Sequence, residues 1–406
     1  MLMDTIFIFL CTLLVWLMTP GLALFYGGLV QSKNVLNTSM HSLAAIVVVT
    51  FVWVGLGFSL SFGGSNLFIG DLSYIGLTGV GYEANAAFSE TIPFALYMLF
   101  QLTFCTIAVS ILTGSVAERM KFGPFLLFMA LWVILVYSPV AHWVWGGGWI
   151  HSIGAIDFAG GTVVHISSGV SGLVLALMLG SRKPDNKKPS HNLVITMVGA
   201  ILVWFGWFGF NAGSALTFDA IAMSAFTNTV LAATAGIAGW VMVERFTKGK
   251  VSLIGTLSGM LAGLVAITPA AGFVTYGGAM ALGLLGGAIC FFAITKLKVL
   301  LNYDDALDAF GLHGIGGIVG AIGTGILQTS VVNPGIADGL LSGGGVTPVL
   351  AQLAAVSATI LFSAVMTYGI AKGISLFTTL RTDEKEELDG LDVVIHGEKA
   401  YEYSNS

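Results

Sequence analysis

Eleven apolar runs, each long enough to cross about 30 Å of hydrocarbon, divide this chain of 406 residues. They lie near 5–30, 39–62, 91–117, 122–141, 158–180, 191–210, 219–243, 252–270, 276–298, 309–328 and 347–380. A bilayer core offers no water to backbone polar groups, so such runs must be helical. Only 9% of the residues are charged, whereas soluble domains carry about 25%. The sequence therefore predicts an all-α polytopic membrane protein with eleven transmembrane helices.

The positive charges indicate the orientation of these helices. All sixteen lysine and arginine residues follow odd-numbered runs. They are Lys33, Arg119, Lys121, Arg182, Lys183, Lys187, Lys188, Arg245, Lys248, Lys250, Lys296, Lys298, Lys372, Arg381, Lys385 and Lys399. Basic residues concentrate on the cytoplasmic side of a membrane, which predicts an N-terminus outside and a C-terminus inside. Acidic residues occur on both sides, so the predicted outer face is negative and attracts cations.

The domain organisation is predicted to be simple. We expect one transmembrane domain at 1–380 and a cytoplasmic tail at 381–406. The run at 5–30 has no basic segment before it and no small-residue cleavage site after it, which predicts a retained helix rather than a signal peptide. The three cysteines are far apart in apolar runs and predict neither a disulfide framework nor a zinc site.

Two histidines within glycine-rich apolar stretches are the strongest candidate site. His165 follows Asp157 by eight residues and so lies about 12 Å deeper along a helix. His313 follows Asp308 on a helix that enters from the opposite face. Ionisable groups inside a membrane are costly and mark functional sites. We predict that the two rings meet near the midplane, where each neutral imidazole can donate and accept hydrogen bonds.

Two other interpretations of these histidines remain open. Each ring could be a packing residue bound to backbone carbonyls, or the pair could ligate a haem. The placement of the pair favours a conduit, because each histidine lies on the fifth helix of a five-helix set. The sets, at about 5–180 and 191–328, have opposite topology, which predicts two inverted repeats with a substrate site between them. The run at 347–380 adds a long eleventh helix.

Aromatic and hydroxyl side chains lie near the predicted outer ends of the same helices. Ring faces attract cations, and hydroxyl oxygens accept N–H donors, so this combination is typical of cation recognition. Interfacial aromatic residues also occur as ordinary belt residues. The candidates are Phe100, Phe104, Trp145, Phe210, Ser214 and Thr268.

Long segments of the chain closely resemble bacterial ammonium transporters of the Amt/Mep/Rh family. The similar segments are PGLALFYGGLV at 20–30, SVAERMKF at 115–122, AHWVWGGGW at 141–149, GAIDFAGGTVVHISSG at 154–169, WFGFNAGSAL at 207–216, ITPAAG at 267–272 and DAFGLHGIGGIVG at 308–320. The resemblance covers essentially the whole length of the chain. It implies a transporter and no enzyme activity, cofactor, metal or nucleic-acid partner.

The resemblance also implies roles for the candidate residues. Trp145, Ser214 and Phe104 would form an outer ammonium recruitment site, with Thr268 beside it. Asp157 would support this site without touching the substrate. Two further pairs complete the implied pathway: a gate of Phe104 and Phe210, and a pore lined by His165 and His313.

Family likeness implies partners as well. Members are homotrimers in the plasma membrane, which is the inner membrane where a cell has two, with one pore per subunit and methylammonium as a substrate analogue. The tail segment GLDVVIHGEKAY at 390–401 resembles the region through which PII-type signalling proteins regulate bacterial members. The expected mechanism is deprotonation of ammonium followed by conduction of ammonia, with separate proton transfer. The alternatives are a neutral gas channel and an ammonium sensor that acts through its tail.

Overall fold

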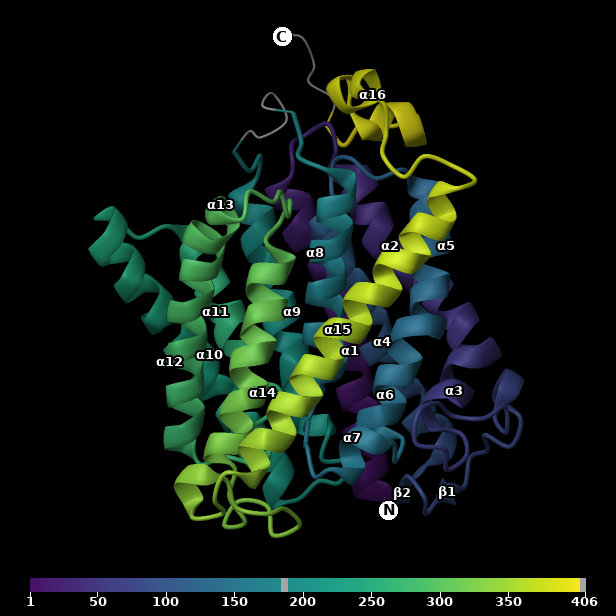
Figure 1. Cartoon of the computed structure of the whole chain (residues 1–406), viewed down its shortest axis with the longest axis vertical. Helices are drawn as coiled ribbons and strands as arrows, with labels where there is room; N and C mark the ends of the chain where they lie inside the picture. The colour runs from purple at the N-terminus through teal and green to yellow at the C-terminus, as the bar shows by residue number, and fades with distance from the viewer. Residues whose placement is uncertain (184–188, 402–406) are drawn as a thin grey trace.

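The chain folds into a bundle of long helices joined by short connections (Figure 1). The computed structural model describes residues 1–183 and 189–401. Lys187 and Lys188, together with the last five residues of the predicted tail, lie outside this part of the chain. Within the described residues, ten helices are long and apolar enough to cross a membrane, and one further apolar helix is shorter. This confirms a helical multi-pass membrane protein, and the predicted count of eleven depends on the shorter helix.

The first five membrane segments contain eleven helical elements. They are α1 (Leu2–Leu29); α2 (Val35–Val52), η1 (Trp53–Gly57) and α3 (Phe58–Phe62); α4 (Phe94–Val116); α5 (Phe122–Trp132), η3 (Val133–Tyr137), α6 (Ser138–Trp145) and α7 (Trp149–Ser152); and η4 (Gly161–Ile166) with α8 (Ser167–Leu179). The short strands β1 (Ala84–Asn85) and β2 (Ser89–Pro93) pair in the connection before α4.

The second half of the chain is arranged similarly. Its elements are α9 (Leu193–Gly213); α10 (Ala220–Lys248); the shorter α11 (Leu253–Ile267); α12 (Tyr276–Phe292), η6 (Ala293–Leu297) and α13 (Lys298–Leu300); and η7 (Phe310–Gly314) with α14 (Ile315–Leu327). They are followed by α15 (Thr347–Ser375), α16 (Glu384–Asp389) and η9 (Asp392–His396). Connections hold the 3₁₀ turns η2 (Ile75–Leu77) and η8 (Leu340–Ser342); the other η segments are π-helical.

Short polar side chains begin the helices of the second half. Asn192, Asp219, Ser252 and Thr275 each accept backbone N–H groups from the first turn of α9, α10, α11 and α12 respectively. These caps satisfy donors that lack a partner within the helix. The helix starts near 192, 219, 252 and 275 therefore follow from local sequence.

Helix α4 lies at the centre of the bundle. Of its most apolar 18-residue window, 89% is buried inside the chain itself, a larger share than for any other membrane-length helix in the described residues. Helix α1 packs along α9, α10 packs against α12, and α15 crosses obliquely over α14, α8 and α5 (Figure 1). The deepest positions of the bundle are consequently on α4, η4 and η7.

The fifth segments of the two predicted halves meet through glycine. A Cβ atom on Gly169 would lie only 2.3 Å from the backbone nitrogen of Gly314, so the two backbones are in direct contact. Both segments begin with a π-helical turn, η4 and η7, and each turn carries one of the candidate histidines. This correspondence is what inverted repeats would produce, although the division at 180–191 remains a prediction.

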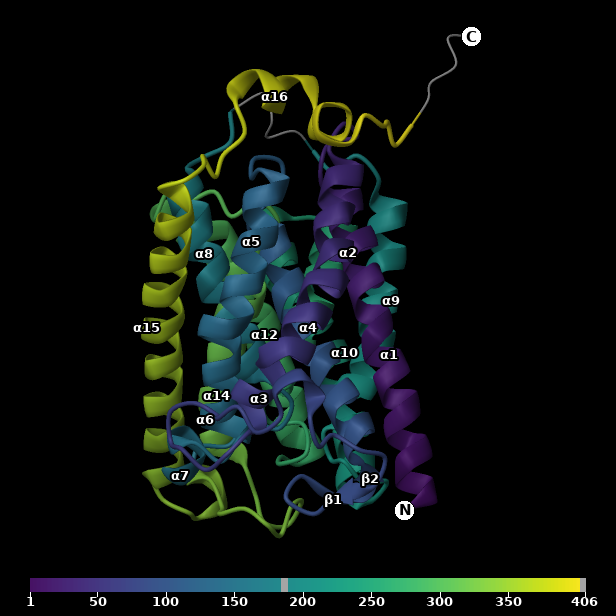
Figure 2. The same cartoon turned by 90° about the vertical axis from the view of Figure 1, so that its right-hand side faces the viewer.

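The N-terminus and the tail lie at opposite ends of the bundle (Figures 1 and 2). We call these the N-terminal end and the tail end. The tail is held against the connection after α1, because the Lys33 ammonium donates to the Glu387 carbonyl at 2.8 Å. The Leu391 N–H donates to Asn34 Oδ1 at 2.9 Å. An N-terminus and tail at opposite ends agree with an odd number of crossings.

Candidate functional site

An aromatic pocket of about 260 Å³ opens at the N-terminal end of the bundle. Three predicted site residues line it, although they come from distant helices: Phe104 of α4, Trp145 of α6 and Ser214 at the end of α9. Its other lining residues are mostly apolar or aromatic: Ala87, Phe88, Tyr97, Gln101, Val144, His151, Phe158 and Leu216. The fold thus brings together three of the six side chains that the sequence grouped, whereas Phe100, Phe210 and Thr268 do not line the pocket.

A closed pair of phenylalanine rings lies beneath this aromatic pocket. Phe104 and Phe210 stack with ring centroids 4.2 Å apart and an angle of 18° between their planes. Both side chains are buried, and Trp145 meets the edge of Phe104 at 5.9 Å. Phe210 does not itself line the pocket. Passage from the pocket into the bundle therefore requires the two rings to move.

Hydrogen bonds fix two polar groups of the aromatic pocket, the Ser214 hydroxyl and the Trp145 indole N–H. The Ser214 hydroxyl donates to the Phe210 carbonyl at 2.9 Å, which leaves its oxygen lone pairs available to an N–H donor. The Trp145 indole N–H donates to the Asp157 carbonyl at 2.9 Å. With its N–H engaged, the indole is held as an aromatic wall, a surface that attracts cations.

The Asp157 carboxylate is occupied by backbone donors rather than exposed to the pocket. It is buried and accepts four N–H groups at 2.8, 2.7, 2.7 and 3.1 Å, from Gly160, Gly161, Thr162 and Val163. These bonds satisfy the start of η4, where Gly160 has a left-handed φ of 116° that favours glycine. Asp157 therefore acts on the site through the backbone of η4.

The two candidate histidines meet at the centre of the bundle. The Nδ1 atoms of His165 and His313 are 3.1 Å apart, so one nitrogen donates its proton and the other accepts it. The rings are nearly parallel, with centroids 5.2 Å apart, and both are buried. The two rings are thus joined through their Nδ1 atoms, while the Nε2 atom of His165 has no partner in the described part of the chain.

Thr268 lies below the aromatic pocket and does not line it. Its hydroxyl oxygen accepts the Trp207 indole N–H at 2.9 Å, and the hydroxyl donates to the Leu264 carbonyl at 2.8 Å. Trp207 in turn stacks on His165 with ring centroids 5.3 Å apart. The structure therefore connects Thr268 to His165 through Trp207, whereas the resemblance implied a place beside the recruitment site.

Two residues that the sequence reasoning did not single out belong to this arrangement. Trp207 is one, and its only sequence signal is its place in the WFGFNAGS segment. The other is Asp305, which precedes His313 by eight residues, the same spacing as Asp157 to His165. Its Oδ2 atom accepts the N–H of Phe310 at the start of η7, at 2.7 Å. Asp305 rather than Asp308 therefore corresponds to Asp157.

A polar vestibule of about 630 Å³ lies at the tail end, with Glu118, Arg182, Asp304, Lys298 and Asp308 in its wall. Arg182 pairs with Glu118 at 2.7 Å and with Asp304 at 2.9 Å, and Lys298 pairs with Asp308 at 2.6 Å. Burial raises the pKa of Asp304, but hydrogen bonds and the charge of Arg182 outweigh it and hold that pKa below its usual value. The vestibule is consequently lined by ion pairs.

A haem between the histidines does not fit this geometry. Two ring nitrogens in hydrogen-bond contact at 3.1 Å leave no space for a macrocycle and its iron. The stacking of His165 on Trp207 also fixes the ring on its other side. The arrangement instead suits a small hydrogen-bonding substrate that follows an aromatic pocket, a ring gate and an imidazole pair.

Comparisons with known proteins agree with this geometry. A profile of the Ammonium Transporter Family matches residues 6–401. An ammonium transporter of Bacillus subtilis is 56% identical over 401 residues, which covers 99% of each chain. The structure resembles that of Saccharomyces cerevisiae Mep2, with a TM-score of 0.88 and 34% identity over 95% of this chain and 90% of that one. It also resembles a "Sensor Amt Protein", with a TM-score of 0.88 and 29% identity over 97% and 98%. The chain belongs to the ammonium transporter family, whose members are membrane transporters and not enzymes.

Proposed function

We propose that the protein recruits ammonium in the aromatic pocket, removes a proton at the pore mouth and conducts ammonia past His165 and His313. The single observation that carries this proposal is the imidazole pair, joined at 3.1 Å and buried directly beyond the closed phenylalanine gate. A hydrated cation has no place in such a passage, whereas a small neutral molecule that donates and accepts hydrogen bonds does.

Recruitment depends on weak forces in combination. The rings of Phe104 and Trp145 attract a cation through their faces, an effect of about 0.5–2 kcal/mol per ring. The Ser214 oxygen supplies an acceptor for one ammonium N–H. No carboxylate lines the aromatic pocket within the described residues, and Asp157 is engaged by four backbone donors. The site would therefore hold ammonium loosely and release it readily toward the gate.

Deprotonation explains how a cation site can feed an apolar pore. Moving a full charge to the membrane centre costs at least about 2.5–3.5 kcal/mol. Ammonia avoids this cost, and the imidazole nitrogens offer it hydrogen bonds along the way. Potassium has no proton to lose and would be excluded. The proton would travel separately, through the hydrogen bond that joins His165 and His313.

Topology and assembly form part of the same proposal. We infer eleven membrane crossings, with the N-terminus outside and the tail at 381–406 in the cytoplasm of a cell whose plasma or inner membrane holds the protein. The basic residues support this orientation, because Lys33, Arg182 and Arg381 all lie at the tail end. We also propose a homotrimer with one pore per subunit, and regulation of the tail by a PII-type protein, as the resemblance of the tail segment and the pore motifs to the family implies.

Two alternative functions remain. A neutral gas channel would share the imidazole pair but would have no use for the cation-binding walls of the aromatic pocket. A sensor is favoured by one specific observation, the structural likeness to a Sensor Amt Protein. Removal of residues 381–406 separates these ideas: a transporter would still conduct, whereas a sensor that signals through its tail would lose its response and keep its ligand.

Electrical recording from proteoliposomes tests the proposal directly. We expect a current with ammonium, a smaller one with methylammonium and none with potassium. Replacing both pore histidines, as His165→Leu with His313→Leu, should abolish the ammonium current. His41→Phe is the matched control, because His41 is a buried histidine that stacks on Phe122 outside the pore. Absence of any ammonium current would exclude the proton-coupled mechanism, and a normal current in the double variant would reduce the pair to a packing role.

A further inference from the structure

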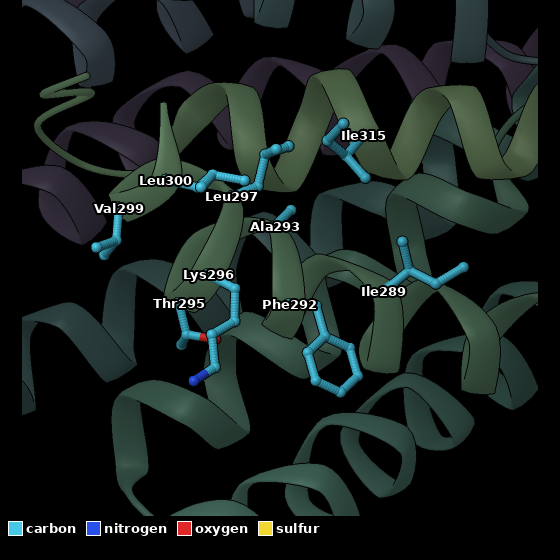
Figure 3. Close-up of a pocket in the computed structure, with 9 residues that line it drawn as sticks. All are labelled: Ile289, Phe292, Ala293, Thr295, Lys296, Leu297, Val299, Leu300 and Ile315. Atoms are coloured by element: carbon cyan, nitrogen blue, oxygen red, sulfur yellow. The ribbon is translucent and has the colours of Figure 1, made fainter. Parts of the chain in front are cut away.

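A histidine lines the aromatic pocket beside the residues already assigned to recruitment. His151, in the last turn of the short helix α7, belongs to the pocket wall and is exposed. Neither the polar vestibule nor a groove of about 720 Å³ on the face of α12, η6 and α13 (Figure 3) has a histidine in its described wall. The groove carries one charged side chain instead, Lys296. Of these three cavities, the aromatic pocket is therefore the one on which the charge of a lining histidine can act.

The aromatic pocket offers His151 no carboxylate partner among its described lining residues. The connection before α4 contributes Ala87 and Phe88 to the wall, whereas the acids Glu83 and Glu90 of the same connection do not line it. A protonated imidazole at this position would therefore add a positive charge that no acidic group of the described wall compensates.

Titratable groups on the neighbouring segments are buried. His142 belongs to α6, which packs against α7, and its Nδ1 atom lies 3.1 Å from the Ser61 carbonyl oxygen. Asp157 follows α7, and its carboxylate accepts four backbone N–H groups. Tyr97 of α4 lines the pocket and is buried as well. His151 is thus the exposed titratable side chain of the described pocket wall.

We propose, as an extension that rests on the function proposed above, that the charge of His151 sets the affinity of the aromatic pocket for ammonium. A neutral imidazole has one nitrogen lone pair that can accept an ammonium N–H, as the Ser214 oxygen can. A protonated imidazole has no acceptor, and its positive charge repels a bound cation. Histidine typically passes between these two forms between about pH 5 and 8. Ammonium should therefore bind less tightly as the pH falls through this range.

The other polar side chains of the wall do not change charge over this range. Gln101 has a buried Oε1 atom without a hydrogen-bond partner in the described residues, so it can accept an N–H group, but an amide stays neutral. The Ser214 hydroxyl also stays neutral. The pore histidines lie beyond the closed phenylalanine gate, so their protonation should alter the maximum current rather than the half-saturating ammonium concentration. These two quantities separate an effect of the pocket wall from an effect of the pore.

Coulomb's law gives the expected size of the effect. The half-saturating ammonium concentration should rise about fivefold between about pH 7.5 and about pH 5.5. This ratio is the equivalent of about 1 kcal/mol, the repulsion between two unit charges about 4 Å apart in water. Because His151 is exposed, salt should screen the repulsion. The rise should therefore be smaller at high ionic strength.

Currents recorded from proteoliposomes with the same pH on both sides of the bilayer test this inference. The wild type should show the rise in half-saturating ammonium concentration. His151→Gln should keep the low concentration at both pH values, because its amide retains an acceptor and is not protonated. His151→Lys should show the high concentration at both. Lys296→Gln is the matched control, since it removes a charge from the groove on α12 and should keep the wild-type profile.

Two results would overturn the inference. An equal half-saturating concentration at both pH values in the wild type would show that the charge of His151 does not act on the pocket, and this measurement needs no variant. An equal rise in the wild type and in His151→Gln would assign the pH dependence to another group. Absence of an ammonium current at either pH would instead contradict the proposed function, so the two failures are distinguishable.

Discussion

The two ends of the proposed pathway differ in the chemistry of the residues that line them. At the N-terminal end, the aromatic pocket of about 260 Å³ has aromatic walls and the Ser214 hydroxyl oxygen as an acceptor. The nearby Asp157 carboxylate is occupied by backbone N–H donors. At the tail end, the polar vestibule of about 630 Å³ has ion pairs in its wall. A small aromatic site can discriminate among cations, so the proposed function assigns selection to the N-terminal end and release to the tail end.

The largest effect is expected from Asp157→Asn, because this change places an amide NH₂ against two of the four backbone donors. Charge-assisted hydrogen bonds contribute about 1.5–3 kcal/mol each, so losing two should destabilise the fold by about 3–6 kcal/mol. Thermal unfolding of the purified protein and ammonium uptake should both fall sharply. Asp305→Asn is the comparison, since Asp305 accepts the Phe310 N–H and lies at the other end. Equal losses in the two variants would contradict the proposed difference between the ends.

A smaller effect is expected from Arg182→Gln in the polar vestibule. Breaking a buried ion pair costs about 3–5 kcal/mol, and the Arg182 side chain is 11% exposed, which places the loss near the lower value. Discrimination between ammonium and potassium should stay unchanged, because the proposed function places selection in the aromatic pocket. Lys183→Gln is the control, since it removes an exposed pair with Glu384. Altered selectivity in Arg182→Gln would assign part of the filter to the vestibule.

The same variant has a pH signature. In the folded protein the pKa of Asp304 lies below its usual value, so its ion pair stabilises the fold above that usual value and loses this contribution as acidification passes the lowered pKa. Without Arg182, the stabilisation is absent and unfolding should begin at a higher pH. Melting temperatures measured across an acid series would reveal the difference between the wild type and the variant.

The smallest effect is expected from Ser214→Ala in the aromatic pocket. Loss of one hydrogen bond of about 1 kcal/mol should raise the half-saturating ammonium concentration by about fivefold, with little change in stability. Asp308→Asn, in the vestibule, should leave that concentration unaltered. A similar rise in the half-saturating ammonium concentration in both variants would mean that both ends take part in recognition.

The sequence predicted the membrane segments because their signal is local. The run at 158–180 is observed as Gly161–Leu179, and the run at 191–210 as Leu193–Gly213. The run at 122–141 was too short, since α6 continues to Trp145 and the short helix α7 follows at Trp149–Ser152. The run at 219–243 stopped at the first charged side chain, although the helix continues to Lys248.

The site residues could be predicted from the sequence where a motif contains them. Their contacts could not be predicted where packing between separate helices determines them. The grouping of Phe104, Trp145 and Ser214 agrees with the aromatic pocket. The π-helical turns, by contrast, leave no periodicity in the sequence. They obscure which aspartate corresponds to Asp157, because Asp308 is nearer to His313 in sequence while Asp305 has the spacing of Asp157 and accepts the Phe310 N–H. Thr268 shows the same limit, since its bond to Trp207 joins two separate helices.

The glycine contact between the fifth segments constrains how the molecule can work. Gly169 and Gly314 touch through their backbones, close to the histidines on the same two segments. Alternating-access transporters rock one half against the other around a central site, and such rocking would pull this contact and the imidazole pair apart together. Motion confined to the rings of Phe104 and Phe210 would disturb neither the glycine contact nor the imidazole pair. The glycine contact therefore supports the proposed conduction past His165 and His313 with motion confined to side chains, rather than a carrier cycle.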